Sequence, residues 1–478
     1  MPGLWVYCSS SSFPIFRKMS SCFSKTARLS CVLLLAGLFS CATYQSKPID
    51  QVAVSRRLVA PSMAAIRVKA LQIRHPLLKP RHIDFAKGLS AGDAAVIAVI
   101  ANPALRAQRD RLGVAKAQLI QAGILPNPSF SYSLDVPSGG SDQGTVNAYG
   151  FGIDWNILKS LLTRGAKVDA ARAQEASVNL DIAWAEWQVA ESAKLSVYRV
   201  VMLQKELRVA QREENALRKN LEAIRKAVAE GNMTLVDLDA VDATLRRIHT
   251  TVLDIKQKLK QEKLALNRVM GFPPSSGVPL KAGMGLPTVK ILPSLSGIMK
   301  GIENRRLDLL ALRQGYKSRE ASLREAVRAQ FPNISIGFSH ARDTTNVITT
   351  GFGVSISLPF FDRNQGRIAI EKAGRQQLYD EYMDRVFQAR ADAASILADI
   401  RSVDKQIAAA HRAVKTQQKL VHVSYNGFLE GNIDALSYYN EVDRLTTRRL
   451  DVLKLEQNLA DLYVALEITA GEYIGSSK

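Results

Sequence analysis

Apolar residues recur at alternating spacings of four and three along two long stretches of the chain. Each stretch rises to the same triplet, Glu-Gly-Asn, at 230–232 and again at 430–432. Heptad spacing predicts two helices packed as an antiparallel coiled coil, with glycine where the chain reverses. The heptad positions before the tips are Leu203, Leu207, Ala210, Leu217, Leu221, Ile224 and Val228, matched by Val403, Ile407, Ala410, Gln417, Val421, Ser424 and Phe428. The chain therefore contains a duplicated unit of about 200 residues.

Each repeat is predicted to hold the same four parts in the same order. A helix of about 35 residues is expected near 88–123 and again near 295–330, the first interrupted at Asn102-Pro103. A strand pair follows, then a helix of about 60 residues up to the tip and a returning helix of about 35–40 residues. At 1.5 Å per residue the rising helix would span roughly 90 Å, so it must project beyond a single globular core.

Strict alternation of apolar and small polar residues marks the strands. They are expected at about 128–137 and 147–157 in the first repeat, and at about 333–341 and 347–360 in the second. This length crosses a bilayer when the strand is tilted, with apolar residues facing lipid. A half-buried sheet of a soluble protein also alternates, but two aligned copies in an exported chain favour membrane strands. The apolar positions are Phe130, Tyr132, Leu134 and Val136, and Phe352, Val354, Ile356, Leu358 and Phe360.

The strand count bears on assembly. One chain supplies four strands, and open strand edges cannot face lipid, so chains must pool their strands. Two chains would close a barrel whose interior is filled by side chains. Three chains would give twelve strands around an open lumen. We therefore expect a homotrimer if the protein conducts anything.

The N-terminus is typical of an exported lipoprotein. A short apolar run at 32–38 follows Lys25 and Arg28 and is too short to span a bilayer, so residues 1–40 are predicted to be a signal peptide, with Met19 as an alternative start. The run ends at Cys41 in a sequence that resembles a bacterial lipoprotein box, which makes Cys41 the expected lipid attachment site. The alternative is an ordinary signal peptide with an incidental cysteine.

Charge and cysteine content narrow the function classes. The formal net charge is +20, and all four cysteines lie at or before Cys41, which excludes disulfides and thiolate metal sites from the body. Residues 41–87 are expected to form a basic tether, suited to anionic lipid or simply a solvated linker. Export disfavours nucleic acid as a partner. A Gly/Pro-rich linker at 271–294 separates a first repeat at 88–270 from a second at 295–474.

These features resemble the TolC-like outer-membrane efflux proteins of the lipoprotein kind, over about residues 88–474. The resemblance rests on Asn102-Pro103 through Leu105-Arg106, the stretch Gln-Ala-Gly-Ile-Leu-Pro-Asn-Pro at 121–128, the paired strands and the two tips. The duplicated order of elements is more specific than any single motif. The resemblance implies a mainly α-helical fold with a membrane β-barrel part, in which a trimer's twelve-stranded barrel continues into a periplasmic coiled-coil tunnel.

The same resemblance implies the function and the partners. The chain would be the outer-membrane exit duct of a tripartite efflux pump or type I secretion system. It would bind a periplasmic adaptor and an inner-membrane pump, passing drugs, metal ions or other solutes passively. The stretch at 121–128 is similar to members that serve resistance–nodulation–division pumps. A periplasmic coiled-coil adaptor or structural lipoprotein is the rival interpretation, although an adaptor has one hairpin rather than two.

The candidate site residues also follow from the resemblance. The tips would dock the adaptor, and acidic residues near them would gate the tunnel; in a trimer each inward carboxylate becomes a ring that favours cations. Glycine also has a structural reason at a reversal, and an acidic residue can belong to a solvated, salt-bridged helix face. The tip residues are Gly231, Asn232, Gly431 and Asn432. The gate candidates are Asp237, Asp239 and Asp434, together with Ser437 and Asn440, which are uncharged and depart from the acidic pattern of the family.

Catalysis finds no support in the sequence. The six histidines are scattered without zinc-ligand spacing. Gly150-Phe151-Gly152 and its counterpart at 351–353 lie inside predicted strands and open no helix, so they are not expected to be phosphate loops. They are expected to allow close packing or a bend. We expect no enzyme activity and no cofactor, and an exported enzyme with a helical insert is disfavoured.

Overall fold

The computed structural model describes residues 43–141, 144–289 and 291–474. The chain divides into two compact units, one up to Leu58 and one from Val59 onward. In the first, α2 (Gln51–Arg57) begins at Asp50, whose carboxylate accepts hydrogen bonds from the backbone N–H groups that follow it. The predicted signal peptide and Cys41 lie outside the described residues. No described helix is both long and apolar enough to cross a membrane.

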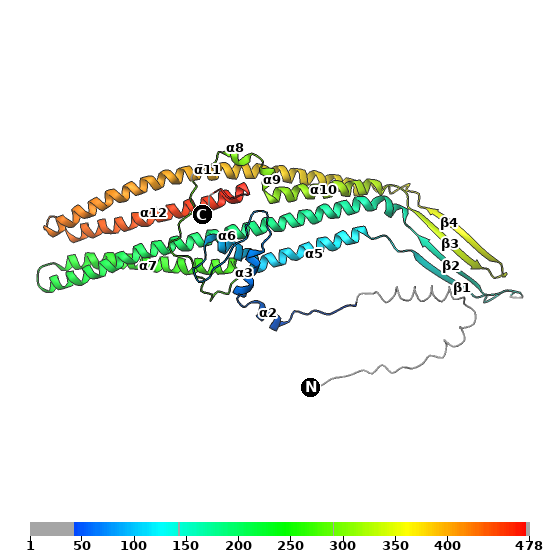
Figure 1. Ribbon diagram of the computed structural model, residues 1–478, viewed down its shortest axis with the longest axis horizontal. Coiled ribbons are helices and arrows are strands. Elements are labelled where there is room, and N and C mark those ends of the chain that lie inside the picture. Colours follow the sequence, from blue (N-terminus) through cyan, green and yellow to red (C-terminus); the bar gives the residue numbers. More distant parts are fainter. Residues whose placement is uncertain (1–42, 142–143, 290, 475–478) are drawn as a thin grey trace, which may run out of the picture. The chain divides into compact units, whose positions relative to one another are not determined.

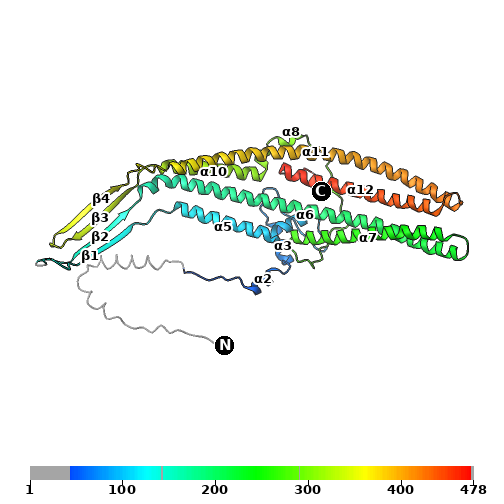
Figure 2. The same ribbon diagram turned by 180° about the vertical axis from the view of Figure 1, so that it is seen from behind.

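The second unit holds the predicted order of helix, strand pair, long helix and returning helix, twice over (Figure 1). Figure 2 shows from the opposite side that each long helix runs beside its returning helix. The elements are α3 (Met63–Leu71), α4 (Ala91–Ala101), α5 (Pro103–Gly123), β1 (Ser129–Asp135), β2 (Ala148–Trp155), α6 (Leu158–Ala229), α7 (Leu235–Val269), α8 (Leu295–Met299), α9 (Ile302–Arg305), α10 (Leu307–Arg328), β3 (Ile334–Arg342), β4 (Ile348–Ile356), α11 (Gln365–Leu429) and α12 (Ala435–Ala470).

The helices differ from expectation in length and continuity. The long helices α6 and α11 have 72 and 65 residues, longer than the sequence suggested. Asn102 separates α4 from α5 as predicted, and its side chain accepts hydrogen bonds from the first N–H groups of α5. The helix expected near 295–330 is instead three pieces, α8, α9 and α10. Gly301, with φ of 72°, lies at one of the breaks, in a conformation that glycine adopts without strain.

The strands form one antiparallel sheet in the order β1-β2-β3-β4. Side chains of one kind line up across it: Phe130, Ile153, Phe338 and Phe352 form a single row on one face. Every residue of β1 and of β4 is exposed, so no layer of the described residues covers those strands on either face, as a soluble half-buried sheet would require. The outer edges of β1 and β4 have no partner strand within the described chain.

Small residues fill the opposite face of the sheet. The row through its middle reads Ser131, Gly152, Ser339 and Gly351. A Cβ added at Gly152 would lie 3.0 Å from the Ser131 Oγ. The glycines therefore leave room for serine hydroxyls on the neighbouring strand, which is the close packing expected for them.

Residues 41–87, which were expected to form a tether, are in large part packed against the rest of the protein. Ile66, Ala70, Leu78 and Ile83 are all buried, and three of them share a core with α4, α6 and α7. Only the stretch up to Leu58 forms a separate unit. The prediction of a tether followed the many basic residues of this region and overlooked the apolar residues between them, which pack into the core.

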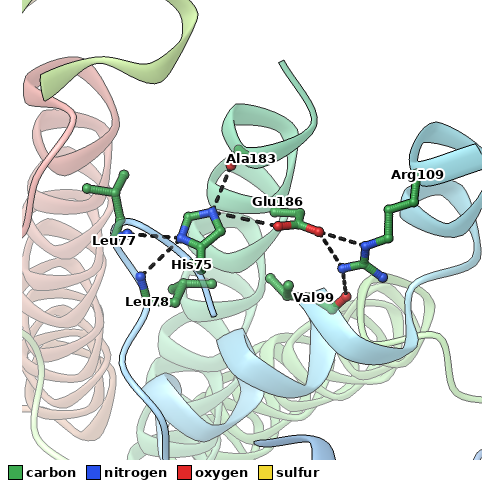
Figure 3. Close-up of polar contacts among 7 residues, drawn as sticks. All are labelled: His75, Leu77, Leu78, Val99, Arg109, Ala183 and Glu186. Carbon is green, nitrogen blue, oxygen red and sulfur yellow. Dashed lines mark hydrogen bonds and ion pairs between the residues drawn. The ribbon is translucent and has the colours of Figure 1, made fainter. Parts of the chain in front are cut away.

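His75 holds this segment to α6 (Figure 3). Its Nδ1 accepts hydrogen bonds from the Leu77 and Leu78 N–H groups at 3.0 and 3.1 Å, and its Nε2 lies 2.9 Å from the Ala183 carbonyl oxygen. Glu186, 3.8 Å from the ring, also binds Arg109 of α5. Burial lowers the pKa of His75, which keeps the ring neutral so that Nδ1 can accept.

A second buried polar group joins the two repeats. The Lys194 Nζ of α6 lies 2.8 Å from Glu191 and 3.0 Å from Glu467 of α12. It also lies 3.9 Å from the centre of the Tyr473 ring, within the range of a cation–π interaction. Burial raises the pKa of Glu191 to about 8. Burial thus favours the neutral form of Glu191, so that Lys194 and Glu467 make up the charged pair and little net charge enters the interior.

Candidate functional site: the hairpin tips

The first tip is a tight helix ending. Gly231 has φ of 76°, the Asn232 N–H donates to the Ala227 carbonyl oxygen at 2.8 Å, and the Gly231 N–H donates to that of Val228 at 3.0 Å. These two bonds define the Schellman ending, which needs a left-handed residue at the position of Gly231. A Cβ at Gly231 would meet nothing within 4 Å, so the turn backbone is uncovered on that side.

The second tip repeats this geometry. Gly431 has φ of 74°, and the Asn432 N–H donates to the Gly427 carbonyl oxygen at 2.7 Å. Ile433 packs over Gly427, where a Cβ would lie 2.9 Å from its Cδ1. The asparagine side chains have the same local role at both tips, donating to Glu230 and Glu430. All four predicted tip residues thus lie on two matching, exposed turns.

Two of the gate candidates cap the returning helices. The Asp237 carboxylate accepts from the Thr234 N–H and hydroxyl, while the Thr234 hydroxyl accepts from the Asp237 N–H, forming a capping box at the start of α7. Asp434 begins α12 by accepting from the Ser437 N–H at 2.7 Å. That hydrogen bond lowers the pKa of Asp434. Asp237, Asp434 and Ser437 therefore have a structural task at the turn.

The remaining gate candidates, Asp239 and Asn440, have no such role in capping a helix. Asp239 is exposed and Asn440 is half-buried, and neither side chain makes a polar contact within the described part of the chain. Asp239 is thus the candidate whose carboxylate is free to face a lumen or a partner.

Exposed apolar side chains surround both turns, which sequence reasoning had not singled out. Leu235 and Val236 at the first tip are 69% and 70% exposed, and Leu429 and Leu436 at the second are 65% and 52% exposed. Ala435, which corresponds to Leu235, is buried. The two tips therefore share a backbone but present different apolar surfaces.

An aromatic cluster packs at the second tip. Phe428 stacks on Tyr438 with ring centres 5.5 Å apart, and Tyr438 contacts Tyr425 and Tyr439. Tyr439 is buried, and burial raises its pKa well above the ordinary value. Tyr438 and Tyr439 therefore serve packing.

The two hairpins are joined within one chain near the tips. Arg247 of α7 and Asp443 of α12 form an ion pair at 2.8 Å. Tyr439 and Ala435 of α12 enter an apolar core built mainly from the first hairpin, whose other buried members are Leu217, Leu221, Ile224, Ala240, Val241, Leu245 and Ile248. This contact fixes one hairpin against the other in the state described.

No group of three or more His, Asp, Glu or Cys side chains suited to a metal ion occurs across the described ranges. What the tips offer is uncovered turn backbone, apolar side chains and a few carboxylates. Such surfaces bind other proteins. Together with the rest of the fold they define a class of protein with two projecting helical hairpins and an amphipathic sheet.

Comparison with known proteins agrees with that class. The family model described as "Outer membrane efflux protein" matches residues 96–272 and 299–472. The chain belongs to this family, whose members are efflux channels of the outer membrane.

Individual relatives are distant but cover most of the chain. The cobalt-zinc-cadmium resistance protein CzcC of Cupriavidus metallidurans is 22% identical over 346 residues, 72% of this chain and 76% of that protein. Among solved structures, CusC matches with a TM-score of 0.69 at 16% identity, covering 86% of this chain and 99% of CusC. The CmeC outer membrane channel of Campylobacter jejuni matches with a TM-score of 0.68 at 13% identity, covering 92% and 95%. These structures confirm the predicted fold.

Proposed function

We propose that the protein is the passive exit duct of a tripartite efflux system, working as a homotrimer with a periplasmic adaptor and an inner-membrane pump. The observation that supports this most strongly is the sheet, which is exposed on both faces along β1 and β4 and has an unpaired edge at each end. Lipid tolerates no open edge. Three copies close a twelve-stranded barrel that leaves a lumen.

The tips supply the docking surface in this proposal. Gly231, Asn232, Gly431 and Asn432 would meet the adaptor through uncovered backbone, helped by Leu235, Val236, Leu429 and Leu436. Gating would need the two hairpins to separate, and the Arg247–Asp443 ion pair opposes that separation. Asp239 would add carboxylates to the passage, while Asp237, Asp434 and Ser437 would act through the shape of the turn. Asn440, half-buried one turn further along α12, would be an uncharged member of the gate.

The cargo is proposed from relatives and chemistry together. CzcC is a cobalt-zinc-cadmium resistance protein, which makes metal ions the first cargo to test, ahead of drugs or secreted polypeptides. The chain would do no chemistry itself, and the energy would come from the inner-membrane partner. Lipid attachment at Cys41 would anchor the mature N-terminus at the outer membrane.

The first experiment is the native mass of the mature protein in detergent. A trimer is expected because it is the smallest simple assembly that closes the sheet around a lumen. A stable monomer would contradict the barrel, and the adaptor or structural lipoprotein would become the better interpretation. Mass at the N-terminal cysteine, read in the same spectra, would reveal acylation of Cys41.

A further inference from the structure

The apolar face of the sheet becomes polar at the loop end of β3. Ile153, Phe338 and Phe352 form a fully apolar row. The next row towards the loops contains His340, and the last contains Arg342, between Tyr149 and Ile348. A permanent cation thus lies on the apolar face, at the end of the sheet away from the helices.

The Arg342 guanidinium is held in place by two contacts, but most of its N–H groups have no partner among the described residues. Its Nη2 donates to the Asn147 carbonyl oxygen at 2.9 Å, and its Cζ lies 4.9 Å from the centre of the Tyr149 ring. Its Nε is shielded and makes no hydrogen bond. Stacking on tyrosine orients the planar group and leaves several of its five N–H donors free.

No carboxylate in the described part of the chain pairs with Arg342. Its neighbour Asp343 is committed to the β3–β4 turn, where one carboxylate oxygen accepts from the Thr345 N–H, the Thr345 hydroxyl and the Val347 N–H. The next acidic strand residue, Asp135, lies on β1 and on the other face of the sheet. Among the described residues, the positive charge of Arg342 therefore has no carboxylate counterion.

We infer that Arg342, oriented by Tyr149, binds the phosphate of a lipid headgroup in the outer leaflet. The inference rests on the proposed barrel, because that barrel turns this face towards lipid. Membrane barrels carry aromatic girdles at headgroup depth, which is where Tyr149 and Arg342 lie. A guanidinium fork matches phosphate geometry with two parallel hydrogen bonds.

Native mass spectrometry of the intact assembly in detergent tests this site. Phosphatidic acid, which has a phosphate monoester headgroup, is titrated against diacylglycerol, which has the same tails without phosphate. Wild type should retain phosphatidic acid selectively, and Arg342→Gln should weaken that binding at least about three-fold. Arg342→Lys, which keeps the charge but not the fork, should lie between the two.

Arg363→Gln is the matched control. Arg363 is an exposed arginine on the connection from β4 to α11, at the helix end of the sheet, and its side chain makes no contact within the described residues. This variant loses the same charge and should bind phosphatidic acid as wild type does. Equal losses in both variants would show unspecific charge attraction and overturn the site.

Two further outcomes distinguish a lipid phosphate from free phosphate, and a failure of the headgroup site from a failure of the proposed barrel. Displacement of the lipid by millimolar inorganic phosphate would mean a free-phosphate site and overturn the headgroup assignment. The mass of the assembly is read in the same spectra. A trimer without selective phosphatidic acid binding would overturn only this inference, whereas a monomer would overturn the barrel and the headgroup site together.

Discussion

Single polar side chains secure the joints between distant segments, and His75 is the clearest case. Its ring is buried, with 1% of the side chain exposed, and three backbone groups surround its two nitrogens. The sequence showed only a scattered histidine, because its partner Ala183 lies 108 residues away and contributes a carbonyl oxygen rather than a recognisable side chain. No spacing rule could have found it.

Replacing His75 with alanine should destabilise the protein by about 1–3 kcal/mol, because the Leu77 and Leu78 N–H groups lose their acceptor. The pKa of His75 is lowered from 6.5, so the folded state binds fewer protons than the unfolded state just below that pH. Wild-type stability should therefore be complete above about pH 6.5 and fall at more acid pH.

Thermal unfolding of both proteins at pH 5.5 and 7.5 checks this. The difference between wild type and His75→Ala should be larger at pH 7.5. His422→Ala removes an exposed histidine and serves as control. A His75→Ala variant with the same melting temperature as wild type at both pH values would contradict a role for this joint.

At the scale of elements, the heptads and strand alternation were sufficient to predict the order of helices and strands. Boundaries were less accurate: β1 ends at Asp135 rather than near 137, where Pro137 cannot donate a ladder hydrogen bond.

Thr234 and Asp237 stand three apart just before an apolar heptad, a spacing typical of a capping box. That signal was available and would have assigned Asp237 to the turn. Arg247–Asp443 was not predictable, because the pair joins helices of different repeats.

Replacing both tip glycines with tryptophan should abolish efflux while the assembly stays intact. A side chain at positive φ costs roughly 1–2 kcal/mol per residue, which long coiled coils can tolerate, whereas the added bulk occupies the uncovered docking side. Metal tolerance of cells and the native mass of the purified double variant check both halves of this expectation. Gly→Ala at both tips imposes the same backbone strain with little bulk and should retain most efflux. Full activity of the tryptophan variant would refute docking at the turns.

At the scale of the whole molecule, the sheet decides where the protein belongs. Sequence alternation alone left a soluble sheet open, since both kinds of sheet alternate. The exposure of β1 and β4 on both faces, together with membership of an outer-membrane family, removes that alternative. The cargo and the open state stay beyond sequence reasoning, because a lumen forms only between copies.

Val354→Arg should reduce the membrane-assembled fraction. It places a charge among lipid-facing residues at a cost of roughly 2–4 kcal/mol near the midplane. Ser355→Arg adds the same side chain one position away on the opposite face, where the lumen would solvate it, and should assemble normally. Quantifying trimers in membrane extracts compares them. Normal assembly of Val354→Arg would contradict the assignment of this face to lipid.

The free edges of β1 and β4 have a consequence for how the protein matures. A newly exported chain cannot satisfy the outward N–H and C=O groups of these strands alone, and an open edge invites aggregation with any other strand. In the proposed trimer the sheet is completed only when other copies arrive, so the yield of folded protein should rise with the rate at which chains meet. Apparent thermal stability should likewise depend on protein concentration, as it does for obligate oligomers. Expression level, and not sequence alone, would then set how much of this protein survives.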